Sequence, residues 1–224
     1  LLSSAVAVAA AGALTLAVDP YAVWGVRRIE GFNAVKPDIY TQADLAKIAQ
    51  ARRLAPKSVI LGNSRMDVGL DPESPVWPAD ARPVFNLAIP GHGLGGDLAN
   101  LRRVFAGGAA PRVAVVGVDF LDFLVDPSRP EAAPALAPPD DGLLVRLHDF
   151  VTTTLSIAAL IDAVDTLRAQ RDPYSPNMTG RGLDTMHQYD EFVQTEGHYD
   201  IFYQRDVEYV RARLGRGTAV VAPG

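Results

Sequence analysis

Short apolar runs alternate with helical spacing of apolar positions along most of the chain. Three apolar runs read as strands, at residues 58–62 and 83–91 and within 112–123, where the third strand is followed by its turn. Helical spacing predicts helices at residues 41–56, 95–108, 142–171 (with a break near 151–154) and 201–215. This alternation predicts an α/β fold, a parallel sheet with helices on both faces, as a domain over residues 41–224.

The N-terminal segment LLSSAVAVAAAGALTLAV, residues 1–18, has no charged side chain. Its length is at the lower limit for a membrane-spanning helix. Three interpretations stay open: a transmembrane signal anchor, a cleaved signal peptide, or an Ala-rich core helix. The first two place the domain outside the cytoplasmic membrane, and we expect an inner-membrane anchor with the domain in the periplasm. Residues 19–40 would then be a connector, with Tyr21 and Trp24 at the membrane interface or packed on the domain.

Two further regions bear on the extent of this domain: a long insertion and the C-terminal end. Residues 126–141 are rich in Pro and Ala, and residues 172–200 are polar and irregular, so we expect an insertion at about 126–200 of the kind that carries binding. Residues 217–224 read as a buried central strand followed by a turn. A chain seldom stops there, so we expect the domain to be C-terminally truncated.

Composition excludes several functions. The chain has 224 residues, a net charge of -5 and no cysteine. An acidic chain lacks the positive charge that neutralises a phosphate backbone, so we expect no nucleic-acid partner. The absence of cysteine removes thiolate catalysis and cysteine metal sites. No phosphate loop or convincing metal-ligand spacing is present, so we expect no metal and no cofactor.

Polar or glycine-containing segments follow each of the three predicted strands: GNSR at 62–65, PGHG at 90–93 and GVDF at 117–120. In open α/β sheets, ligands bind beyond the carboxyl ends of the strands. Ser64 is therefore a nucleophile, or the segment is only a helix start capped by Ser64 or Asn63, or a simple turn. Gly91 is either an oxyanion N–H donor or a turn glycine, and Asp119 either orients Ser64, binds a substrate hydroxyl or accepts N–H bonds in its turn.

Taken together, these segments resemble the SGNH branch of the GDSL esterase superfamily. ILGNSR places Ser64 at the nucleophile position, with Asn63 where the family has Asp. FNLAIPG supplies Asn86 and the oxyanion glycine Gly91. GVDF departs from the family, because Asp119 stands where the family has an oxyanion asparagine, and an ionised aspartate cannot donate a hydrogen bond. The resemblance implies a three-layer flavodoxin-like fold and acyl transfer through Ser64.

The Gly-x-Ser-Arg form and the N-terminal apolar segment look closer to the alginate O-acetyltransferase-like relatives of that superfamily. Those relatives are extracytoplasmic and move or remove acetyl groups on exopolysaccharides. The resemblance implies an acylated carbohydrate or acyl donor as partner, together with polysaccharide-assembly proteins. Arg65 would hold a carboxylate in the site, and a surface arginine is the alternative.

The family's late Asp-x-x-His block, which supplies its general base, is absent from the chain. The candidates for the general base in the chain are His92, His187 and His198, and the alternative is a base beyond Gly224. Two hypotheses follow. The first is a serine-dependent esterase or O-acetyltransferase; the second is a non-catalytic binding or assembly module with the same fold, favoured by Asp119 and the absent block.

Overall fold

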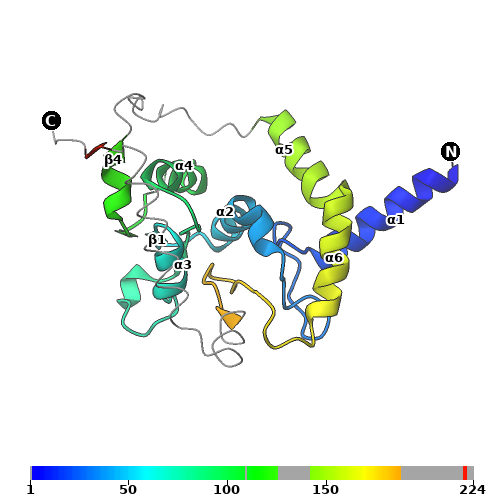
Figure 1. The fold of residues 1–224 in the computed structure, drawn as a ribbon, viewed down its shortest axis with the longest axis horizontal. Coiled ribbons are helices and arrows are strands. Elements are labelled where there is room, and N and C mark those ends of the chain that lie inside the picture. The colour runs from blue at the N-terminus through cyan, green and yellow to red at the C-terminus, as the bar shows by residue number, and fades with distance from the viewer. Residues whose placement is uncertain (1, 109, 126–141, 188–218, 221–224) are drawn as a thin grey trace.

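A parallel three-stranded sheet forms the centre of the fold (Figure 1). The computed structural model describes residues 2–108, 110–125, 142–187 and 219–220. The strands are β1 (Ser58–Leu61), β2 (Val84–Asn86) and β3 (Val113–Val116), in the order β2–β1–β3. Ser58 is opposite Val84 on one side and Val113 on the other. The α/β class predicted from the sequence is confirmed.

The described residues form six α-helices: α1 (Leu2–Val18), α2 (Ala43–Leu54), α3 (Ser64–Gly69), α4 (Leu94–Val104), α5 (Leu143–Phe150) and α6 (Ile157–Ala169). Of these, α2 and α3 contact the sheet, and α1, α5 and α6 lie apart from it (Figure 1). A π-helix, η4 (Val151–Leu155), continues α5, and short 3-10 helices are η1 (Ile39–Gln42), η2 (Ala79–Ala81) and η3 (Phe120–Phe123). The helices expected at 41–56 and 95–108 are thus present as α2 and α4.

The hydrophobic core lies between the sheet and the helices α2 and α4. Its buried members are Ala51, Val59, Leu61, Phe85 and Leu87. From α4, Leu101, Val104 and Phe105 pack against this cluster, as the helical spacing predicts. Burying an aliphatic or aromatic side chain stabilises the fold by roughly 1.5–3 kcal/mol, so this cluster fixes α2 and α4 on the sheet.

The buried faces of α2 and α4 differ in part from those that the apolar spacing predicts. In α2, Lys47 and Gln50 are buried, whereas Leu45 is only partly buried. In α4, Leu98 is 37% exposed, while Asp97 and Asn100 are buried. The reason is that these polar side chains meet polar or sulfur groups from other parts of the chain, as Lys47 meets Asp67, Gln50 meets Met178 and Asn100 meets Asp44, which an apolar pattern cannot indicate.

The expected break in the helical region 142–171 lies slightly later than predicted. The π-helix η4 covers residues 151–155, and the chain then bends by 49° between Leu155 and Ile157. Ser156 is extended, and its side-chain oxygen accepts a hydrogen bond from the N–H of Ala159 at 3.0 Å. Ser156 therefore ends one helix and caps the next.

Helix α1 projects from the rest of the chain and packs on α6 and η4 (Figure 1). Among the described residues, no single helix has the length and apolar content needed to cross a membrane. The bent pair Leu143–Leu155 and Ile157–Ala169 meets that requirement by length and composition. The helix at the N-terminus is confirmed, while its relation to a membrane stays a prediction.

The last strand, β5 (Ala219–Val220), does not extend the central sheet. It pairs antiparallel with β4 (Leu124–Val125) in a separate two-stranded sheet. The expectation of a buried central strand at 217–224 was therefore wrong, because a strand this short can pair with any free edge. The expectations for residues 126–141, 188–200 and 201–215 fall outside the described residues.

Candidate functional site

The three polar segments that follow the strands meet at one edge of the sheet, because the strands are parallel. Asp119, after β3, accepts hydrogen bonds from the side chains of Asn63 and Arg65, after β1. After β2, Gly93 lies beside the same segment: a Cβ added to Gly93 would be 3.2 Å from Asp122 Oδ1. The predicted convergence of these segments is present in the structure.

Ser64 is the first residue of α3, but it does not cap this helix. Asn63 does so, because its side-chain oxygen accepts a hydrogen bond from the N–H of Arg65 at 3.1 Å. Ser64 is exposed, and within the part of the chain that the structure describes, neither its hydroxyl nor its backbone N–H makes a hydrogen bond. Ser64 is therefore not the cap, whereas the Asn63 cap, the other form of that alternative, is present; the role of Ser64 as a nucleophile stays a prediction.

The turn from β1 into α3 depends on a close approach to β3. Gly62 has φ +137, and a Cβ there would lie 2.6 Å from Met66 Cγ and 3.0 Å from the carbonyl oxygen of Gly117. A Cβ on Gly117 would collide with the same Met66 side chain. Both glycines are needed for β1 and β3 to present Ser64 and Asp119 side by side.

Asp119 acts as an acceptor, not as a donor. One carboxylate oxygen of Asp119 accepts hydrogen bonds from both the Asn63 amide and the Arg65 guanidinium. The backbone N–H of Asp119 donates to Asp122 Oδ2 at 2.7 Å. An ionised carboxylate has no hydrogen to donate, so the Asp119 side chain cannot serve as an oxyanion donor in this form. The pair with Arg65 is exposed, so it contributes little to stability and instead orders the mouth of the site.

Gly91 follows β2 and has φ +81. It is exposed, and nothing lies within 4 Å of the position that a Cβ would take. Its backbone N–H has no acceptor among the described residues. The N–H groups of Ser64 and Gly91 are thus both without an acceptor among the described residues, which is one property that an oxyanion hole requires.

His92 is held between two carboxylates. Its Nε2 lies 3.5 Å from Asp44 Oδ2, and its Nδ1 lies 3.9 Å from Asp97 Oδ1. The hydrogen bond to Asp44 raises the pKa of His92 and lowers the pKa of Asp44. Burial raises the pKa of Asp97 to about 6. These contacts favour the protonated form of His92, whereas a general base must be neutral to accept a proton.

The other two histidines are not brought to Ser64 by the described residues. His187 is exposed at the end of the described segment 142–187, and His198 lies outside the described residues. Within the described residues, no hydrogen bond or ion pair joins His92 to Ser64. The structure thus brings Asn63, Arg65 and Asp119 together next to Ser64, without placing His92 there.

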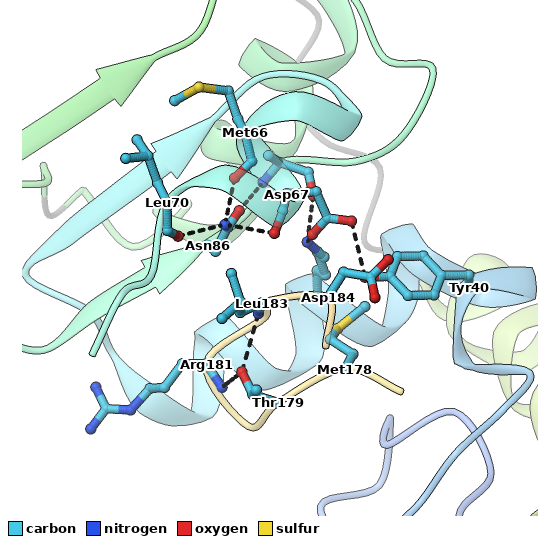
Figure 2. Close-up of polar contacts among 12 residues, drawn as sticks. Tyr40, Met66, Asp67, Leu70, Asn86, Met178, Thr179, Arg181, Leu183 and Asp184 are labelled. Atoms are coloured by element: carbon cyan, nitrogen blue, oxygen red, sulfur yellow. Dashed lines mark hydrogen bonds and ion pairs between the residues drawn. The ribbon is translucent and has the colours of Figure 1, made fainter. Parts of the chain in front are cut away.

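A buried polar network contacts the inward-facing side of α3 (Figure 2). Lys47 Nζ lies 2.5 Å from Asp67 Oδ1 and also donates to the carbonyl of Ala88, which follows β2. Asp67 Oδ2 accepts from the hydroxyl of Tyr40 at 2.9 Å. Lys47 and Asp67 are fully buried, and Asp67 is one helical turn after Ser64. The network therefore links α2, α3 and the end of β2.

Asn86 belongs to this support and does not line the site. Its amide nitrogen donates to three carbonyl oxygens of α3 and its end: Met66 (2.8 Å), Asp67 (3.2 Å) and Leu70 (3.1 Å) (Figure 2). Its side chain is fully buried. Asn86 thus satisfies carbonyl groups that a helix end leaves without partners, and it positions α3.

Burial disfavours the charged forms within this network. It lowers the pKa of Lys47 and raises the pKa of Asp67 and of Tyr40. The sequence analysis missed these residues. The one local signal for Asp67 is the spacing Ser64-x-x-Asp67, which resembles a capping box and predicts that the Asp67 carboxylate lies near the start of α3. In the structure the Asp67 side chain instead turns inward and pairs with Lys47.

Among the residues that the structure describes, no group of three or more His, Asp or Glu side chains is arranged to hold a metal ion. Comparisons with models of known protein families, with characterised proteins and with solved structures give no match to the chain.

Proposed function

We propose that the chain is an SGNH-like acyl esterase or O-acetyltransferase that acts on an acylated carbohydrate through Ser64. The observation that carries this proposal is the exposed Ser64 hydroxyl after β1, which makes no hydrogen bond among the described residues. The backbone N–H groups of Ser64 and of Gly91, which follows the neighbouring strand β2, have no acceptor there either. The strand order β2–β1–β3 agrees with the first three strands of a flavodoxin-like sheet, whose ligand crevice lies between β1 and β3. A flavodoxin-like fold is therefore part of the proposal.

In the proposed reaction, Ser64 Oγ attacks the acyl carbonyl carbon and its proton passes to a base. The N–H groups of Ser64 and Gly91 stabilise the oxyanion that forms. The sugar oxygen leaves as an alcohol by taking up that proton, and the acyl group stays on Ser64 as an ester. Water or another sugar hydroxyl then attacks this ester, loses its proton to the base, and releases Ser64.

The proposal gives the base role to a histidine other than His92, because Asp44 and Asp97 hold His92. The candidates that remain are His187 and His198. Arg65 and Asp119 shape the mouth of the site, where a guanidinium and a carboxylate can hold sugar hydroxyls.

The membrane and its surroundings also belong to the proposal. Helix α1 would associate the domain with the inner membrane, with the domain in the periplasm and polysaccharide-assembly proteins as partners. What supports this is an uncharged helix whose residues 4–10 are all exposed.

A second candidate function is a non-catalytic module that binds an envelope polysaccharide. Two observations favour it: Asp119 is an acceptor where an oxyanion donor is expected, and His92 is paired away from Ser64. In that case Arg65 and Asp119 would bind sugar hydroxyls, and Ser64 would have no chemical role.

The test is the full-length protein with Ser64→Ala, assayed on acetylated model esters. Loss of a nucleophile should lower turnover by about a thousandfold or more. Ser74→Ala is the matched control, because Ser74 lies outside the site, and it should keep full turnover. Unchanged turnover in Ser64→Ala would refute the enzyme. Binding of acetylated oligosaccharide without turnover, lost in Asp119→Ala, would establish the second candidate.

A further inference from the structure

An exposed apolar stripe runs along α5 and η4. Its members are Leu143 (82% exposed), Leu144 (80%), Leu147 (55%), Val151 (44%) and Leu155 (44%). They recur at three- and four-residue spacing, which places them on one side of the helix. Two exposed basic or titratable side chains, Arg146 and His148, flank the stripe. An apolar stripe bordered by such residues is typical of a helix that lies in a membrane interface.

Helix α1 lies next to this stripe and is apolar on all its sides. It contains no charged residue over Leu2–Val18, and Val6 and Val8 are 62% and 58% exposed. A helix that is apolar all round is ordinarily buried in a core or in lipid. In this fold α1 has protein contacts with α6 and η4, but its residues 4–10 are exposed.

The two apolar elements form one continuous surface. A groove of about 620 Å³ lies between them, with Val8 and Gly12 on one side and Phe150 and Leu155 on the other. At the border of this surface, the Trp24 ring lies 5.5 Å from the Phe150 ring, and Trp24 is 39% exposed. Arg27 follows and is exposed. Tryptophan and arginine beside an apolar surface are characteristic of the membrane–water boundary.

We propose that α1 and the α5–η4 stripe together dock on a phospholipid bilayer, so that α5 lies in the interface beside α1. The membrane association rests on the proposed function, but the part played by α5 goes beyond it and does not depend on Ser64. Lipid is the occupant that the border of this surface fits, because exposed Arg27 and Arg146 stand beside the uncharged helix α1. Arginine side chains at the edge of an apolar surface match the anionic membrane–water boundary.

The absence of cysteine allows single labelled positions in the full chain. A polarity-sensitive fluorophore is attached to Leu144→Cys on α5, to Val6→Cys on α1, or to Val76→Cys as a control. Val76 is 82% exposed, like Leu144, but lies between α3 and β2, away from the surface. With vesicles of phosphatidylcholine and phosphatidylglycerol, the labels at 144 and 6 should brighten and shift to the blue, and the label at 76 should not.

A response at 6 without a response at 144 would overturn the inference and leave α1 as the only contact. A blue shift of the label at 144 that grows with protein concentration in the absence of lipid would also overturn the inference, because it would indicate contact with a second copy of the chain. In a flotation assay, Leu144→Glu should lower vesicle binding by about tenfold or more, and Val76→Glu should not. Esterase turnover of the same Leu144→Glu variant is measured in parallel, so that failure here and failure of the Ser64 chemistry are told apart.

Discussion

The buried ion pair between Lys47 and Asp67 should hold α3, and therefore Ser64, in place. Replacing Lys47 with Met removes the partner of Asp67 Oδ1 and the donor to the carbonyl of Ala88. Both side chains of the pair are fully buried. Removing one partner from a buried pair costs about 3–5 kcal/mol, because a charge is left without compensation. Lys47→Met should lower the free energy of unfolding by about this amount.

The double variant tests the reasoning more sharply than the single one. Combining Lys47→Met with Asp67→Asn removes both charges and keeps an acceptor for the hydroxyl of Tyr40. The double variant should be more stable than the sum of the single effects predicts, by about 2 kcal/mol or more.

Urea denaturation, followed by tryptophan fluorescence, measures these free energies. The control is Arg112→Ala, which breaks an exposed pair with Asp80 and should cost no more than about 1 kcal/mol. If the effects of Lys47→Met and Asp67→Asn add to within about 0.5 kcal/mol, the two side chains are not coupled and the reasoning fails.

Two further predictions concern the surroundings of the site. Gly182→Ala should destabilise the fold by more than about 1 kcal/mol, because Gly182 has φ +82 and a Cβ there would lie 2.1 Å from the carbonyl oxygen of Asn86; Gly180→Ala, where nothing lies within 4 Å, is the control in the same urea experiment. Burial raises the pKa of Asp97 from 3.8 to about 6, so its protonated form is favoured in the fold and its contribution to stability is present below pH 4 and lost as the pH rises through 6. Relative to Asp97→Asn, the wild-type chain should lose up to about 3 kcal/mol over that window, and parallel stability curves would show that Asp97 does not titrate in this way.

The sequence predicts the features of the site that depend on local patterns. The apolar run of β1 and the glycine and polar residues after it place Ser64 at a strand end, and the parallel arrangement follows from the alternation of strands and helices. Which residue caps α3 was not decided in advance, because Asn63 and Ser64 are both good caps. The hydrogen bond from the N–H of Arg65 to the side-chain oxygen of Asn63 decides it in the structure.

Features that depend on tertiary partners were missed or predicted wrongly. Lys47 is buried because Asp67, twenty positions later, compensates its charge, and no pattern within α2 contains that information. The loop that carries Gly182 reaches the end of β2 from a distant part of the chain. The pairing of β5 with β4 likewise depends on which strand edge is free, not on the apolar character of residues 217–224.

The central claim is that Ser64 is a nucleophile, and covalent labelling tests it most directly. The intact full-length chain is treated with a fluorophosphonate, digested, and its peptides are mapped by mass spectrometry. The account predicts one phosphonate adduct on Ser64, which disappears in Ser64→Ala and persists in Ser74→Ala. A folded wild-type chain without an adduct on Ser64, or equal labelling of wild type and Ser64→Ala, would contradict the account.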